Sequence, residues 1–326
     1  MQKTILVAGG AGYIGSHTQK YLLKNNYNVV VLDNLVYGHK EAVLTENFEH
    51  VDLCDKEALD VIFKKYKIDA VIHFAAYTYV GESVTSPKKY YRNNVVNTLN
   101  LLDAMVENDV KNIVFSSTCA TYGNPQYTPI DEKHPQNPIN PYGNTKFMME
   151  KIMADYETAY GLNYIALRYF NAAGCDAQGE LGESHDPETH IIPLVLKAIK
   201  GEIPQISVFG TDYDTPDGTC IRDYIHVEDL ADAHMLAVEK LIKDGKSYCI
   251  NLGTGIGTSV KEIIQAAEEV TGKSVPLVYG ERRVGDPAKL YASNQMSKDV
   301  LGWNPKYTDV KKIIETAWLW EQNKKF

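Results

Sequence analysis

The sequence predicts an α/β fold in which a doubly wound parallel sheet is followed by a second, smaller mixed α/β domain. Three observations predict it: short apolar runs without polar alternation, amphipathic stretches between them, and a change of composition after about residue 171. Strands covered on both faces of a parallel sheet read as near-continuous apolar runs, and their alternation with helices is typical of doubly wound domains. For 326 residues we expect two domains, over residues 1–171 and 172–326.

The first half supplies the strands and helices of the expected sheet domain. Strands are expected at residues 4–7, 29–32, 70–74, 112–115 and 164–167. Helices are expected at residues 18–24, 56–66 and 93–106, and in the last of these Val95, Leu99, Leu102 and Val106 follow helical spacing.

The second half is richer in loops. Gly, Asp, Glu and His crowd residues 174–190, which we expect to form a long loop, with the acidic side chains of residues 182–188 in solvent. Helices are expected at residues 193–200 and 227–241. The apolar run at residues 247–252 reads as a strand that can return to the first sheet.

Composition excludes several classes of protein. The hydrophobic share is 44% and the charged share 23%, as in ordinary globular chains. The net charge of −9 argues against a nucleic-acid partner and against attachment to an anionic membrane surface. Five cysteines without a C-x-x-C motif are typical of reduced thiols, and the first residues lack a signal-peptide pattern, so we expect a cytoplasmic protein.

A glycine-rich turn follows the first expected strand. Gly9, Gly10, Gly12 and Gly15 fit G-x-G-x-x-G, the pattern that a Rossmann domain uses to bring backbone N–H groups and a helix N-terminus to a pyrophosphate. The second strand ends at Asp33, whose carboxylate can bind a ribose diol and repel a 2′-phosphate. Asp52 and Leu53 follow a third apolar run and can reach an adenine. The combination predicts NAD as the cofactor.

Tyr142 and Lys146 form a Tyr-x-x-x-Lys pair, one turn apart on an expected helix. An ammonium beside a phenol favours the phenolate, so Tyr142 can act as general base on a substrate hydroxyl and as acid on the return. Ser117 and Thr118 end the strand that precedes this helix. Since strand ends line the ligand crevice of a doubly wound sheet, either hydroxyl can meet Tyr142 over the substrate.

These motifs resemble those of the sugar-nucleotide epimerases among the extended short-chain dehydrogenases/reductases, over essentially the whole chain. The matching segments are GGAGYIGSH (9–17), LDNL (32–35), VIHFAA (71–76), GESV (81–84), FSST (115–118), PYGNTK (141–146), RYFN (168–171), PDGTCIRDYIHVEDL (216–230), NLG (251–253) and RRVGD (282–286). The resemblance implies NAD-dependent epimerisation at C4 of a UDP-hexose. UDP-galactose and UDP-glucose would interconvert through a transient 4-keto sugar, an isomerase reaction of galactose metabolism.

The resemblance also implies a role for each matching residue. Tyr142 would be the acid/base, Lys146 would hold the nicotinamide ribose, and Thr118 would bind the sugar. The other cofactor contacts would be Gly9, Gly12, Tyr13, Ile14, Gly15, Asp33, Asn34, Asp52, Leu53, Phe74, Ala75, Asn93 and Phe170. The UDP-sugar would contact Thr118, Tyr142, Asn171, His190, Ser207, Val208, Phe209, Arg222, Arg283 and Asp286. A homodimer would form through the helices near residues 93–106 and 145–160.

Several alternatives stay open at this stage. Thr78 replaces a Lys of some relatives, and Leu290 replaces a Tyr or Cys that limits the sugar pocket, so epimerisation of UDP-N-acetylglucosamine is a second interpretation. A dehydratase would carry Asp-Glu where Cys119 and Ala120 stand. A decarboxylase on the same fold is another alternative, whereas a non-catalytic NAD sensor would typically have lost Tyr142 or Lys146.

The histidines admit both structural and functional interpretations. His17 follows the glycine turn and can touch a phosphate or face solvent, whereas His73 and His226 are expected in structural roles. His185 and His190 are not expected to bind a metal, because no third ligand stands at a usable spacing.

Overall fold

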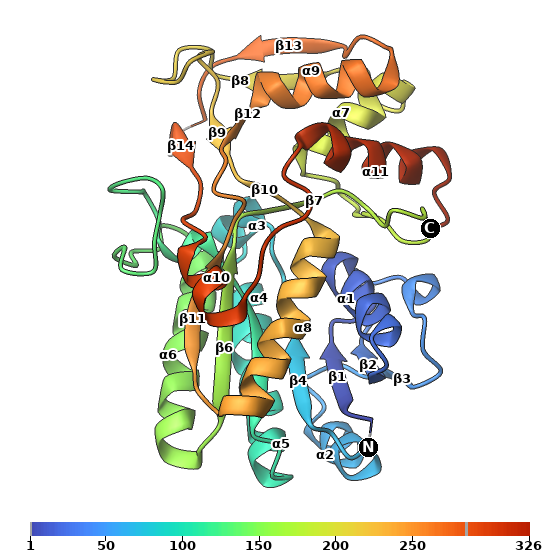
Figure 1. Cartoon of the computed structure of the whole chain (residues 1–326), viewed down its shortest axis with the longest axis vertical. Coiled ribbons are helices and arrows are strands. Elements are labelled where there is room, and N and C mark those ends of the chain that lie inside the picture. Colours follow the sequence, from blue (N-terminus) through green and yellow to red (C-terminus); the bar gives the residue numbers. More distant parts are fainter. Residues whose placement is uncertain (1, 284–285) are drawn as a thin grey trace.

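The computed structural model of the chain describes residues 2–283 and 286–326, so Val284 and Gly285 of the RRVGD motif lie outside the described residues. Seven parallel strands form the central sheet, in the order β11-β6-β5-β4-β1-β2-β3 (Figure 1). Their bounds are β1 Thr4–Ala8, β2 Asn28–Asp33, β3 Phe48–His50, β4 Ala70–His73, β5 Asn112–Thr118, β6 Asn163–Tyr169 and β11 Tyr248–Leu252. The doubly wound fold is confirmed, and β11 is the expected returning strand.

The continuous apolar runs are explained by burial on both faces of this sheet. Along β1, Leu6 and Ala8 join one buried cluster, whereas Ile5 and Val7 join another. Successive strand residues point to opposite faces, so a strand that is covered twice needs apolar side chains at every position. One face is covered by α2 and α5, with α6, and the other by α1 and α8.

Of the helices around the sheet, α2 and α8 agree with the expected positions within three residues, α1 begins five residues earlier than expected, and α3 and α4 were not predicted. Their bounds are α1 Tyr13–Lys24, α2 Lys56–Lys65, α3 Val80–Thr85, α4 Pro87–Tyr90, α5 Asn97–Glu107, α6 Pro141–Tyr160 and α8 Val227–Asp244. Two short 3₁₀ turns, η1 Lys40–Ala42 and η3 Cys119–Thr121, lie between them. The helix expected at 93–106 is interrupted, because its first turns form a π-helix, η2 Tyr91–Val96. Such a turn often marks a functional site.

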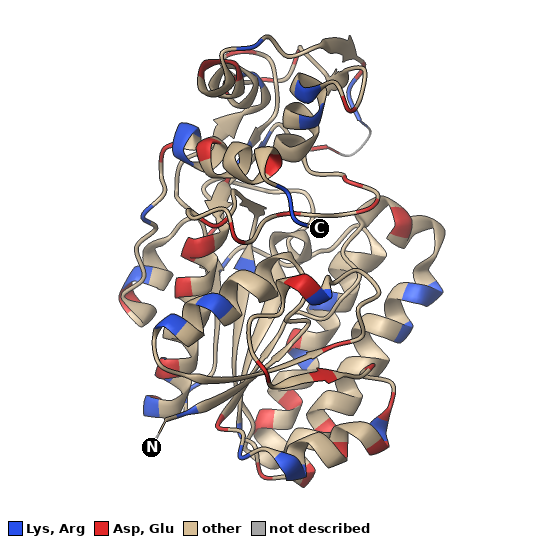
Figure 2. Ribbon diagram, turned by 90° about the vertical axis from the view of Figure 1, so that its right-hand side faces the viewer, with Lys and Arg blue, Asp and Glu red and all other residues tan. Residues whose placement is uncertain are grey.

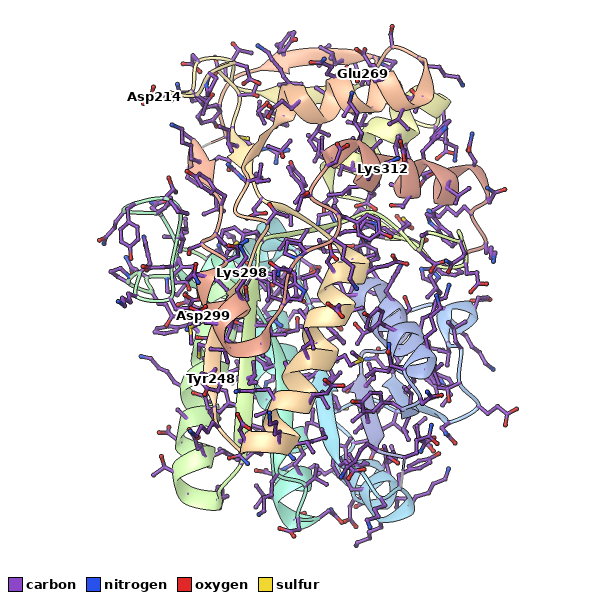
Figure 3. All side chains as sticks on the ribbon, in the orientation of Figure 1. Asp214, Tyr248, Glu269, Lys298, Asp299 and Lys312 are labelled. Atoms are coloured by element: carbon purple, nitrogen blue, oxygen red, sulfur yellow. The ribbon has the colours of Figure 1, made fainter. Side chains whose placement is uncertain are left out.

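The rest of the chain forms a second lobe with its own apolar cluster. Its helices are α7 Ile191–Lys200, α9 Val260–Thr271 and α11 Val310–Gln322, while α10 Gln295–Leu301 packs beside β11. The small strands are β7 Asn171–Ala173, β8 Ile206–Phe209, β9 Ile221–Arg222, β10 Tyr224–His226, β12 Thr258–Ser259, β13 Leu277–Gly280 and β14 Lys289–Leu290. Glu269 on α9 and Lys312 on α11 mark two of these helices in Figure 3.

The surface carries both signs of charge. Figure 2 shows Lys and Arg interspersed with Asp and Glu along the ribbon. Within residues 2–283 and 286–326, no helix is long and apolar enough to cross a membrane.

Candidate functional site

A cleft opens at the carboxyl ends of β1, β2 and β4, where the strand order reverses between β1 and β4. Open α/β sheets bind ligands at this switch point. Nine of the residues expected at the cofactor line the cleft: Gly9, Gly12, Asp33, Asn34, Asp52, Leu53, Phe74, Ala75 and Asn93. Tyr37 and Gly38, which the sequence analysis did not single out, line it as well. Both residues follow shortly after Asp33 in the sequence, and this proximity was the only sequence feature that could have placed them at the cleft.

The glycines of the turn have different tasks. Gly9 has φ +82°, and a Cβ there would lie 2.5 Å from Ala75 N after β4. A Cβ on Gly15 would lie 2.1 Å from Gly9 O, so this glycine lets α1 pack against the turn. At Gly12 the nearest atom would be 3.5 Å away, and the residue lines the cleft. The missing side chain of Gly12 therefore leaves room for a ligand, as a pyrophosphate requires.

Acidic and amide side chains form the far wall of the cleft. Asp33 accepts hydrogen bonds from Ala11 N and Leu35 N, both at 2.9 Å, and burial raises its pKa. Asn34 donates to Asp52 at 2.6 Å. These bonds hold the carboxylates against the cleft, in positions that suit a ribose and a purine. Tyr13 and Ile14 lie at the start of α1 instead, and the Tyr13 hydroxyl donates to Gly174 O.

Tyr142 and Lys146 lie in the first turns of α6, which Asn140 caps by accepting from Gly143 N at 2.8 Å. Lys146 is buried, and its Nζ donates to Ser116 O at 2.7 Å in β5. Among the described residues it makes no other hydrogen bond, which leaves two N–H donors for a ligand. Burial lowers the pKa of Lys146 to about 7.

Tyr142 is half-buried, and burial raises the pKa of its phenol, since the phenolate loses hydration. A hydrogen bond from the Thr118 side chain acts in the opposite direction on this pKa. Thr118 at the end of β5 therefore lies beside Tyr142, and Lys146 bonds to the same strand at Ser116. The π-helical turn that carries Asn93 is tied to the same helix, because Asn94 Nδ2 donates to Thr145 at 3.2 Å.

The second lobe places the residues expected at the UDP-sugar on short strands and loops. Ser207, Val208 and Phe209 belong to β8, and Arg222 ends β9. The Val208 side chain is buried in the lobe's core, so only its backbone can meet a ligand. Asn171 begins β7 and donates from Nδ2 to Asp223 O at 3.1 Å. Phe170 lies between β6 and β7.

The arginines of this lobe are held by carbonyls, carboxylates and rings. Arg222 donates to Ile221 O at 2.7 Å and Pro287 O at 2.9 Å, and it pairs with Asp286. The Arg283 guanidinium lies 4.1 Å from the centre of the Phe209 ring. Leu290 stands beside Arg222 in the β14–β9 register. Arg222 and Asp286 therefore lie together, and Arg283 lies against Phe209 of β8.

A second cavity, of about 500 Å³, adjoins the second lobe. Asp286 and Asp214 line it from the lobe, and the loop at residues 124–128 lines it from the sheet domain. Asp214 projects from the loop between β8 and β9 (Figure 3). The sequence analysis missed the 124–128 loop, because no motif marks it.

One of the two alternatives for His17 is wrong, and so are two inferences about the loop that contains residues 182–190. His17 does not face solvent: it is buried, and its Nδ1 bonds to Tyr13 O at 2.8 Å. The 182–188 stretch is not simply solvated, because Glu183 is buried. The argument that His185 and His190 lack further ligands fails too, since Glu183 and Glu188 lie beside them.

His73 and His226 have the expected structural roles. His73 is buried and bonds to Thr98 at 2.8 Å. His226 is buried, stacks on Tyr307 and bonds to Thr316 at 3.0 Å.

Comparison with known proteins identifies the family. The sequence profile of the NAD dependent epimerase/dehydratase family matches residues 5–253. The chain belongs to this family. A UDP-glucose 4-epimerase of Halalkalibacterium halodurans is 54% identical over 98% of this chain and 95% of its own length. The family assignment confirms the expectation of NAD as cofactor.

Solved structures of family members share the whole fold. A UDP-glucose 4-epimerase of Brucella ovis in complex with NAD has a TM-score of 0.96 and 54% identity, and covers 97% of both chains. A UDP-glucose 4-epimerase of Stenotrophomonas maltophila, with bound NAD and formylated UDP-arabinopyranose, has a TM-score of 0.95 at 38% identity, covering 99% and 98%. The family and the fold are therefore established for this chain.

Proposed function

We propose that the chain interconverts UDP-galactose and UDP-glucose by NAD-dependent epimerisation at C4, through a transient 4-keto sugar. The observation that carries the proposal is the Tyr142–Lys146 pair, packed at the end of β5 beside Thr118. Relatives that are 54% identical and named UDP-glucose 4-epimerase support the choice of reaction. In a cell, this reaction would serve galactose metabolism.

The residues present fit NAD. Gly12 leaves open space at the turn, the Asp33 carboxylate faces the cleft, and Lys146 keeps two free donors. We assign the pyrophosphate to the glycine turn with Tyr13 and Ile14, the adenosine to Asp33, Asn34, Asp52 and Leu53, and the nicotinamide side to Lys146 and Phe170. When bound, NAD supplies a hydride acceptor for the sugar C4 and later returns the hydride.

Tyr142 moves the proton. Its phenolate oxygen takes the proton of the sugar 4-hydroxyl, and the phenol gives it back to the keto oxygen after the sugar has turned over. The Thr118 side chain hydrogen-bonds to Tyr142, so it can also hold the sugar 4-hydroxyl near the Tyr142 phenol. In its protonated form the buried Lys146 favours the phenolate by its positive charge.

The second lobe holds the nucleotide. A guanidinium matches a pair of diphosphate oxygens better than an ammonium does, so Arg222 and Arg283 are assigned to the diphosphate. Asn171, His190, Asp286 and β8 complete the UDP contacts. Leu290 stands next to Arg222 and is intermediate between the bulky and the small residue of relatives, so UDP-N-acetylglucosamine is the second candidate substrate.

One incubation tests the reaction. Purified protein without added NAD should convert UDP-galactose to UDP-glucose, and Tyr142→Phe should lower the rate by about 10²- to 10⁴-fold. Tyr307→Phe, which changes a tyrosine that bonds to Glu228, is the matched control. The proposal fails if the wild-type protein, with NAD added, converts neither UDP-galactose nor its N-acetylated counterpart.

We further infer a cytoplasmic homodimer. All five cysteines are free, as in a reducing compartment. Val96 before α5, together with Met148 and Tyr160 on α6, exposes apolar surface that a second copy would cover. Light scattering should give twice the chain mass, and Met148→Glu should shift it toward the monomer.

A further inference from the structure

Four side chains within eight residues converge in the loop between β7 and α7: Glu183, His185, Glu188 and His190, here called the His–Glu cluster. Their ligand atoms all lie within 4.8 Å of one another. His185 Nδ1 is 3.2 Å from a Glu183 oxygen and 3.6 Å from a Glu188 oxygen, and His190 Nδ1 contacts the same Glu183 oxygen. Both imidazoles thus turn a nitrogen toward the carboxylates.

The two carboxylates are buried, which is unusual for a loop. The side chains of Glu183 and Glu188 are 4% and 3% exposed, that of His185 is 20% exposed, and that of His190 is 48% exposed. A buried carboxylate is costly unless it is paired or binds a metal. His185 Nδ1 is itself buried, and within the described part of the chain it has no hydrogen bond of acceptable geometry. A cation among these four groups would satisfy all of them.

The donor set selects the kind of cation. Two imidazole nitrogens and two carboxylate oxygens suit Zn²⁺, which takes four His, Cys or carboxylate ligands in a tetrahedral arrangement. Calcium and magnesium prefer oxygen ligands alone. We propose that the His–Glu cluster binds one zinc ion per chain.

The surroundings hold the cluster in place from both lobes. Trp320 on α11 donates to Glu183 O at 3.1 Å. Tyr79 donates to Pro187 O at 2.9 Å, and His39 bonds to Ser184 O at 3.1 Å. The Tyr13 ring meets His185 edge-on. A zinc ion would therefore fasten the loop where the lobes meet, beside the glycine turn, and its effect would be on stability.

The competing interpretation is a metal-free network of protonated histidines and carboxylates. The carboxylates raise the pKa of His185 to about 9, although burial opposes this. The histidines hold the pKa of Glu183 at about 2. Protons and zinc compete for the same nitrogens, so a direct measurement of metal has to decide between the two.

The test is a metal titration of the full-length protein. The chain is treated with EDTA, dialysed against metal-free buffer at neutral pH, and titrated with zinc chloride by calorimetry, while bound metal is measured by mass spectrometry. Wild-type protein should bind one zinc ion per chain. His185→Asn and Glu188→Gln should each weaken binding at least tenfold. His50→Gln removes an exposed histidine outside the cluster and should bind zinc as the wild type does.

Two further readouts keep the result independent of catalysis and of variant folding. Zinc should raise the melting temperature of the wild type, and at the same zinc concentration it should raise that of Glu188→Gln by less. Cobalt(II) in the wild-type protein should give the visible absorption of a tetrahedral site. Failure of the EDTA-treated wild type to bind zinc would overturn the proposal, as would equal zinc affinity in His185→Asn and the wild type. His190 is also assigned to the UDP contacts, but zinc binding is measured here without a sugar nucleotide, so the proposed epimerase reaction stands or falls by its own incubation.

Discussion

The cofactor cleft is positioned by backbone, whereas the opposite lobe positions its charged groups by side chains. In the cleft, Gly9 N donates to Leu32 O at 2.8 Å, and Asp33 is fixed by two backbone N–H groups. Across the molecule, Arg222 and Arg283 stand on or beside strands of two to four residues and depend on Asp286 and Phe209. A rigid site suits a bound cofactor, whereas side chains that can adjust suit the proposed nucleotide substrate, which has to enter and leave.

If the sheet domain is the more rigidly positioned region, the substitution that lowers stability most should lie inside it. Arg168 pairs with Glu150 through two hydrogen bonds, at 2.6 and 2.9 Å, and both side chains are buried. Arg168→Met leaves a buried carboxylate without its partner, so the free energy of unfolding should fall by about 3–5 kcal/mol. Urea denaturation measures it.

Arg92→Met, at an exposed position on η2, is the control and should change little. A loss below about 1 kcal/mol in Arg168→Met would mean that the pair is hydrated and the sheet domain is less rigid than we argue.

Buried neutral histidines should make the sheet domain sensitive to acid. Burial lowers the pKa of His73 to about 3, against 6.5 in the unfolded chain. Between these values the unfolded state binds more protons, so stability is lost as the pH falls from about 6.5 to 4. The slope is at most about 1.4 kcal/mol per pH unit for each such histidine.

His73→Gln can still bond to Thr98, and its free energy of unfolding should fall less steeply with decreasing pH than that of the wild type. Chemical denaturation at a series of pH values compares the two proteins. His50→Gln, on the surface, serves as the control and should lose stability with decreasing pH as steeply as the wild type. If the stability of His73→Gln fell with pH as steeply as that of the wild type, His73 would not be a source of the acid sensitivity.

The cofactor half could be predicted because its positions follow from covalent spacing. A strand, a glycine turn and a helix are continuous in sequence, so Gly9, Gly12, Asp33 and the Tyr142–Lys146 pair could be placed from the motifs. Even here the π-helical turn that carries Asn93 was missed. It depends on tertiary contacts such as Asn94 with Thr145, which no periodicity reveals.

The second lobe was less predictable because long-range contacts form it. The two-residue strands β9, β12 and β14 carry too few residues for an alternating pattern. Glu183 lies in a stretch of polar sequence, yet it is buried, with Trp320 donating to its backbone carbonyl and the Tyr13 ring edge-on to the neighbouring His185. Composition alone therefore predicted solvent-exposed side chains at residues 182–188, where the fold buries Glu183.

A smaller effect is expected at the open glycine of the cleft. A Cβ on Gly12 would meet only Gly9 O, at 3.5 Å, so Gly12→Ala should fold normally. The added methyl occupies space that the pyrophosphate needs, and NAD affinity should fall at least tenfold, or about 1.4 kcal/mol. Bound NAD after gel filtration reports it.

Gly81→Ala, where a Cβ meets no atom within 4 Å, is the matched control for this change. Full NAD retention in Gly12→Ala would show that the cofactor does not approach the turn at this residue.

The smallest effect should come from the exposed ion pair of the second lobe. Arg282 pairs with Asp212 at 2.6 Å, but the side chains are 45% and 74% exposed. Exposed pairs contribute about 0–1 kcal/mol, so Arg282→Met should barely change unfolding by urea. The double-mutant cycle with Asp212→Asn isolates the pair itself. A coupling above about 2 kcal/mol would show a pair as strong as a buried one. The second lobe would then be as rigidly fixed as the cofactor cleft, and the contrast between the two regions would fail.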